Sequence, residues 1–108
     1  MYARQISMSL KPNSAAGFTK KLETEVIPLL RKQKGFKDEI TFVNPTGKEA
    51  FAVSMWDNKE NAEAYGRGSY TEVNKILSDL VEGTPQLKTF EIANSTCHKI
   101  AASSQAAR

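Results

Sequence analysis

The sequence predicts an α+β fold of the ferredoxin-like type, with the order β-α-β-β-α-β and a four-stranded antiparallel sheet. Three observations predict it: apolar residues that alternate in short segments, apolar residues at helical spacing in longer ones, and turn-forming residues between them. The 108 residues suffice for one domain. We expect this domain to cover residues 1–100, and we expect residues 101–108, rich in Ala and Ser, to form a flexible tail.

The first strand is predicted over residues 2–10. Its apolar residues alternate, and those on one face are Tyr2, Ile6, Met8 and Leu10. Arg4 falls on the same face. A buried Arg4 would need an anionic partner, supplied by Glu91, by Asp38 or by a carboxylate of a bound substrate.

A helix is predicted over residues 14–34. Apolar residues recur there at helical spacing, and they are Phe18, Leu22, Val26, Leu29 and Leu30. Asn13 or Ser14 is the expected N-cap, and Gly35 is placed to end the helix. Pro28 lies inside the pattern, so we expect it to kink the helix or to break it in two.

Two further strands form the expected hairpin. They cover residues 36–43 and 49–56, with a turn at 44–47. Ile40 and Phe42 share one face of the first, and Phe51, Val53 and Met55 share one face of the second.

The second helical region is expected to be interrupted. A short helix begins at a capping-box-like sequence, residues 57–60, and runs to about Tyr65, and the Gly-Arg-Gly sequence at 66–68 then breaks it. A further helix capped by Ser69 or Thr71 is expected to end at residues 82–85. The last strand is then predicted over residues 86–100.

Composition excludes several classes of protein. A net charge of +3 with scattered Lys and Arg gives little support to a nucleic-acid partner. A single cysteine, Cys97, excludes a disulfide framework and a multi-cysteine metal site. No stretch approaches the ~20 apolar residues of a membrane span, and we expect a cytoplasmic protein without a membrane partner.

Four segments, together with the element order, resemble the antibiotic biosynthesis monooxygenase-like family of dimeric α/β-barrel proteins. They are residues 27–31, 35–36, 54–57 and 60–65, and the similarity extends over residues 2–100. The resemblance implies a homodimer whose sheets pack face to face, with a pocket between sheet and helices in each subunit. It also implies oxidation of phenols or quinols by molecular oxygen, often without metal, haem or flavin.

The same resemblance directs attention to Trp56 and Tyr65 as catalytic candidates. Haem-degrading relatives place a His on the helix after the Trp, and residues 63–68 contain none. Relatives that oxidise polyketide quinones use an Asn where this chain has Ala52, so the best-understood catalytic pattern is incomplete here.

Other candidates come from the residues themselves. His98 is the only histidine and is therefore a candidate general base. Arg4, Tyr70 and Asn94 are candidate polar contacts to a substrate, and Phe18, Leu22 and Phe42 are candidate pocket walls. For each of them, ordinary packing or surface exposure is the alternative.

The function expected from these observations is cofactor-independent oxidation of an aromatic phenol, quinol or polyketide-like ring by a homodimer. The absence of an evident acid–base constellation keeps a second reading open, in which the same barrel binds a small hydrophobic ligand without changing it. A third reading is a dimerisation domain with no pocket.

Overall fold

The structure, a computed structural model, describes residues 1–97 and has the predicted order β-α-β-β-α-β. Its elements, in chain order, are β1 (Tyr2–Leu10), α1 (Ala15–Lys21), η1 (Leu22–Val26), α2 (Ile27–Arg31), β2 (Phe36–Val43), β3 (Glu49–Trp56), α3 (Lys59–Arg67), α4 (Tyr70–Leu77) and β4 (Val81–Glu91). The predicted ferredoxin-like fold is confirmed.

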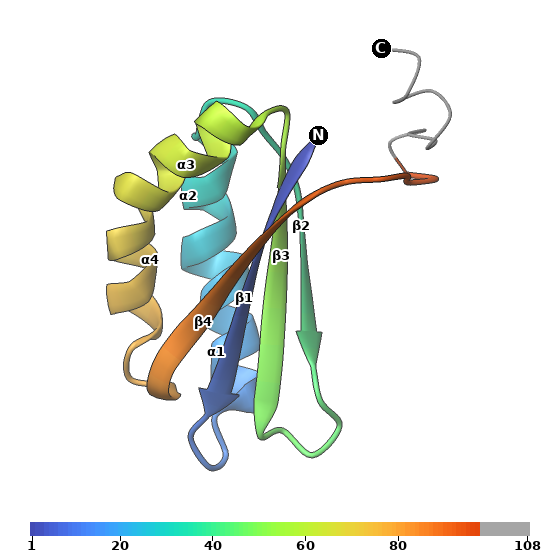
Figure 1. Cartoon of the computed structure of the whole chain (residues 1–108). Helices are drawn as coiled ribbons and strands as arrows, with labels where there is room; N and C mark the ends of the chain where they lie inside the picture. Colours follow the sequence, from blue (N-terminus) through green and yellow to red (C-terminus); the bar gives the residue numbers. More distant parts are fainter. Residues whose placement is uncertain (98–108) are drawn as a thin grey trace.

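The four strands form one antiparallel sheet in the order β2-β3-β1-β4, and the helices all cover one of its faces (Figure 1). The register places Ser54 of β3 between Arg4 of β1 and Glu39 of β2. On the other side of Arg4, Thr89 of β4 continues this row. Direct partners point to the same face, so the row lies beneath the helices.

The first helical run accommodates Pro28 without being broken. Because Pro28 has no N–H, it cannot donate to the carbonyl of Thr24. The turn before it, η1, is a π-helix, in which the N–H of Ile27 donates to the carbonyl of Leu22. The run ends at Arg31, earlier than predicted, and Gly35 then adopts a φ of 80°. A Cβ at Gly35 would collide with Asp57 and Asn61, so glycine is required at this position.

The boundaries around β4 differ from the prediction. The last helix, α4, ends at Leu77, and residues 82–85 belong to the strand instead of ending the helix. Residues 83–85 lie opposite Met8 in a bulge, since Ser7 pairs with Gln86 whereas Ser9 pairs with Glu82. Pro85 is tolerated because β4 is an edge strand. The Gly-Thr-Pro sequence therefore marks a bulge and not a helix end.

The predicted extent of the last strand is also wrong within the described residues. The strand ends at Glu91, and beyond it the N–H of Ile92 donates to the carbonyl of Met1. Asn94 is exposed and lies outside β4. The predicted continuation over residues 98–100, and the expected tail at 101–108, lie outside the described residues.

The core lies between the sheet and the helices. Phe18 and Trp56 are its largest fully buried side chains. The opposite face of the sheet is apolar and open. Phe42 and Phe51 stack there with ring centroids 4.6 Å apart, and Ile40 and Phe90 are also exposed. Within residues 1–97 no helix is long and apolar enough to cross a membrane.

Candidate functional site

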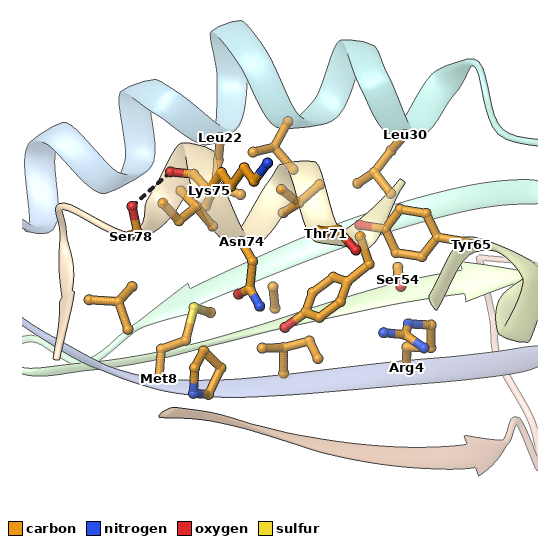
Figure 2. Close-up of a pocket in the computed structure, with 18 of the residues that line it drawn as sticks. Arg4, Met8, Leu22, Leu30, Ser54, Tyr65, Thr71, Asn74, Lys75 and Ser78 are labelled. Atoms are coloured by element: carbon orange, nitrogen blue, oxygen red, sulfur yellow. Dashed lines mark hydrogen bonds between the residues drawn. The ribbon is translucent and has the colours of Figure 1, made fainter. Parts of the chain in front are cut away.

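A cavity of about 520 Å³ lies between the sheet, the first helical run and α4 (Figure 2). This volume lies within the range of small-molecule sites. Its apolar walls come from both layers and are Ile6, Met8, Leu22, Val26, Leu30, Ala52, Val73, Leu77 and Val81. Polar side chains also line it, and the most deeply buried of them is Arg4.

Arg4 is only 5% exposed, yet it has no anionic partner within residues 1–97. Its guanidinium carbon lies 5.3 Å from the ring centroid of Tyr65 and 5.1 Å from that of Tyr70. The two rings stabilise the cation by cation–π contact, but neither accepts a hydrogen bond from the buried Nε–H. The expected ion pair with Glu91 or Asp38 is not formed. The cavity therefore contains a cation with unused hydrogen-bonding capacity.

Gly66 of α3 allows Arg4 to take this position. A Cβ at Gly66 would lie 2.5 Å from Nη1 of Arg4, well inside van der Waals contact. The break predicted at residues 66–68 does not begin at Gly66, because α3 continues to Arg67. The absence of a side chain at Gly66 instead leaves space for the guanidinium.

The two tyrosines present protonated hydroxyls to the cavity. Burial raises the pKa of Tyr65 far above its usual value, and the nearby Arg4 cation offsets only part of this shift. Burial also raises the pKa of Tyr70, again against the effect of Arg4. Burial lowers the pKa of Arg4, but a guanidinium stays charged at neutral pH. Arg4, Tyr65 and Tyr70, all hydrogen-bond donors, thus lie together at one end of the cavity.

Trp56 lies behind this end and does not line the cavity. Its ring stacks on Tyr65 at a centroid distance of 4.9 Å and contacts the edge of Phe36. Its indole N–H donates to Oγ of Ser54 at 2.9 Å, so it is not available to a substrate. The Ser54 hydroxyl proton remains available to a ligand, because Ser54 itself lines the cavity.

Glu39 of β2 is a cavity residue that the sequence reasoning missed. It is half-buried, and its Oε2 accepts a hydrogen bond from Thr41 two residues along the strand. Burial raises the pKa of this carboxyl, and the Thr41 hydrogen bond partly counteracts the shift. The alternation of side chains along a strand could have indicated its position, since Glu39 alternates with Ile40 and Phe42 and must face away from them.

The mouth of the cavity lies between α4 and β4. Exposed polar residues of α4 and of its C-cap line it, and those labelled in Figure 2 are Thr71, Asn74, Lys75 and the C-cap Ser78. The bulged residues 83–85 of β4 line it from the sheet side. The four-residue spacing from Tyr70 to Asn74 would have placed both side chains on one face of a helix.

The other predicted site residues are dispersed. Leu22 lines the cavity as expected, whereas Phe18 is fully buried in the core and does not line it. Phe42 was predicted as a pocket wall, but it does not line this cavity, because its ring lies on the opposite sheet face against Phe51. Asn94 is exposed beyond β4 and away from the cavity lining. His98 lies outside the described residues.

Residues that could hold a metal ion do not cluster in residues 1–97. In that part of the chain, no three His, Cys, Asp or Glu side chains come together. The described donors of the cavity are instead suited to a ligand oxygen, because Arg4 and the two tyrosine hydroxyls offer hydrogen bonds to an acceptor.

The fold matches solved structures at low sequence identity. A monooxygenase of Streptomyces coelicolor, solved with nanaomycin D, has a TM-score of 0.74 and 14% identity, covering 87% of this chain and 88% of its own. A cofactor-independent oxygenase of Streptomyces nogalater has a TM-score of 0.70 and 11% identity, covering 88% of this chain and 95% of its own.

A protein of unknown function from Nitrosomonas europaea also matches, with a TM-score of 0.72, 14% identity and coverage of 88% of this chain and 91% of its own. No family model and no curated protein matches the sequence. Other matching structures carry the family name antibiotic biosynthesis monooxygenase. The chain therefore has the ferredoxin-like βαββαβ fold of the antibiotic biosynthesis monooxygenase structures.

Proposed function

We propose that this protein binds a flat aromatic ring bearing an ionisable hydroxyl and oxidises it with molecular oxygen, without a bound cofactor. The observation that carries the proposal is the buried Arg4, which has no anionic partner within residues 1–97, in a cavity with large apolar walls. A phenolate oxygen supplies the anion that Arg4 lacks within residues 1–97. The ring of the same ligand occupies the space between the apolar walls.

The chemistry requires no external reductant. A phenol with a C–H carbon para or ortho to the hydroxyl takes up one O₂, which yields a quinone and one water. One oxygen atom enters the ring and the other leaves as water. The phenolate is the electron donor, because its negative charge makes the ring easier to oxidise. A cavity that stabilises the phenolate and excludes water therefore favours the reaction.

Oxygen consumption tests the proposal. We expect the chelator-treated protein to consume O₂ above autoxidation with at least one member of a panel containing 1-naphthol, 1,4-dihydroxynaphthalene and anthrone. With a phenolic substrate and ¹⁸O₂, mass spectrometry should find one labelled atom in the quinone. If the ring compounds bind but are recovered unchanged, the protein is a binding module and the proposed oxidation is wrong.

We also propose that a second copy of the chain covers the open face of the sheet. Large apolar side chains from β2, β3 and β4 gather there, and four of them are 36–49% exposed: Ile40, Phe42, Phe51 and Phe90. An apolar patch that extends across several strands is uncommon on a monomer. Face-to-face packing of two such sheets would bury these side chains.

The substitution Phe42→Glu tests this arrangement. We expect the wild-type chain to have the mass of a dimer in light scattering, and the variant to dissociate at the same concentration, because a carboxylate would be buried against Phe51 and its symmetry mate. The control is Lys20→Glu, an exposed position on α1, which should remain dimeric. A monomeric wild-type protein, or a dimeric Phe42→Glu variant, contradicts the arrangement.

A further inference from the structure

We propose that Glu39 is the catalytic proton acceptor of this cavity, taking the hydroxyl proton of the aromatic ligand while Arg4 holds the resulting phenolate. The inference rests on the proposed function for the identity of the ligand, and it adds a residue and a step that the sequence did not suggest. Glu39 is the only carboxylate among the cavity-lining residues of the described chain.

The sheet register places the two charged groups on either side of Ser54. Ser54 pairs with Arg4 on β1 and with Glu39 on β2, so the two residues are separated by two strand spacings, about 10 Å between backbones. They form no ion pair with each other. Opposite charges in one cavity that do not neutralise each other leave room for a ligand between them.

Tyr65 lies within the electrostatic reach of both groups. The positive charge of Arg4 lowers the pKa of its hydroxyl and the negative charge of Glu39 raises it, although burial has the larger effect. A ligand hydroxyl near Tyr65 would therefore experience the same two charges. One of them stabilises its phenolate, and the other can remove its proton.

One hydrogen bond holds the Glu39 carboxylate in place. Thr41 donates to Oε2, which fixes the group on the strand, and no residue within 1–97 donates to Oε1. Burial increases the proton affinity of the carboxylate. The other titratable groups of the cavity are unsuited to accept a proton, because Tyr65 and Tyr70 stay protonated and Arg4 and Lys75 are cations.

The step is balanced in charge and protons. Before transfer the cavity contains a neutral phenol, an anionic Glu39 and a cationic Arg4. The phenol O–H bond breaks and an O–H bond to Glu39 forms, which leaves a phenolate beside Arg4 and a neutral carboxyl. No proton leaves the cavity, so the net charge of the complex is that of its separate components.

Proton release on binding tests the step without any turnover. The probe is 4-nitrophenol, whose phenol and phenolate differ in visible absorption and which resists oxidation because the ring is electron-poor. Binding is measured by calorimetry in buffers of different ionisation enthalpy, at a pH below the ionisation midpoint of the free probe. We expect wild type to bind the probe as phenolate with almost no proton release.

The variant Glu39→Gln cannot take the proton. We expect it to release about one proton to the buffer for each phenolate bound, or to bind the probe as the neutral phenol. Asp38→Asn is the matched control, since it removes the neighbouring carboxylate on the opposite sheet face, and it should behave as wild type. A wild-type complex that contains neutral phenol, or a Glu39→Gln complex that contains phenolate but releases no more protons than wild type, overturns the proposal.

With a substrate that the wild-type protein oxidises, Glu39→Gln should lower kcat by about 10²- to 10⁴-fold, the usual effect of losing a general base. KM should change little, and the low-pH limb of the wild-type pH–rate profile should be lost. If no substrate of the panel is oxidised, the proposed oxidation fails while the calorimetric result still decides whether Glu39 accepts a proton.

Discussion

Replacing Arg4 by Met is expected to reduce the affinity for phenolate ligands by about 10- to 150-fold while leaving the fold at least as stable. A charge-assisted hydrogen bond contributes about 1.5–3 kcal/mol, and each 1.4 kcal/mol is a factor of ten in Kd. The ligand-free protein gains by the same substitution, because a buried cation to which the described part of the chain offers no anionic partner is costly and Met fills a similar volume. The affinity for the phenolate should therefore fall, while the melting temperature should rise or stay the same.

Titration with 4-nitrophenol and thermal unfolding followed by circular dichroism measure the two effects. Arg31→Met is the control, because Arg31 is exposed at the end of α2 and does not line the cavity. If Arg4→Met binds the phenolate as tightly as wild type, Arg4 is not the anion-binding group. If the variant instead unfolds at a clearly lower temperature, the guanidinium is a structural element of the core.

Trp56→Ala is expected to lower the free energy of unfolding by about 3–5 kcal/mol, the usual cost of removing a fully buried large aromatic ring. Trp56 has no exposed surface and supports Tyr65 by stacking and Ser54 by a hydrogen bond. Small domains are stable by about 5–15 kcal/mol, so this loss is a large share of the total. Loss of activity in this variant would report loss of packing and not a direct role in the chemistry.

The variant Trp56→Phe separates the contribution of the aromatic ring to stability from that of the indole N–H. It keeps an aromatic ring beneath Tyr65 and removes the indole N–H, so we expect a smaller loss of stability than in Trp56→Ala. Urea unfolding followed by circular dichroism compares the variants, because the protein has no other Trp for fluorescence. If Trp56→Ala is as stable as wild type, the packing role is wrong. If Trp56→Phe unfolds as easily as Trp56→Ala, the hydrogen bond to Ser54 matters more than the ring.

The element order could be predicted because each segment has its own periodicity, but the orientation of β2 could not. Its two alternating sets are Glu39, Thr41 and Val43 on one face and Ile40 and Phe42 on the other. The more apolar set faces away from the helices. Hydrophobicity identifies the face covered by the helices only when a single face of the sheet is apolar. In this sheet both faces are apolar. For the same reason Phe42 was misplaced and Glu39 was missed.

The candidate site was predictable in part for a related reason. Tyr65, Tyr70, Leu22 and Arg4 could be proposed from residue type and position, and all four line the cavity. That Trp56 lies behind Tyr65 depends on side-chain packing between β3 and α3, which periodicity does not encode. The mouth beside residues 83–85 depends on a bulge, and Gly and Pro in a sequence indicate a bulge and a turn equally well.

The contact between Gly66 and Arg4 couples two positions that lie 62 residues apart in the chain. The guanidinium of Arg4 occupies space that a side chain at position 66 would fill, so a substitution of Gly66 has to move the Arg4 side chain. Among homologues, the informative signature of this cavity is therefore the joint occurrence of Arg and Gly at the two positions. A homologue with a larger residue at position 66 should have moved the guanidinium or replaced the arginine, and its preference for an anionic ligand should be weaker.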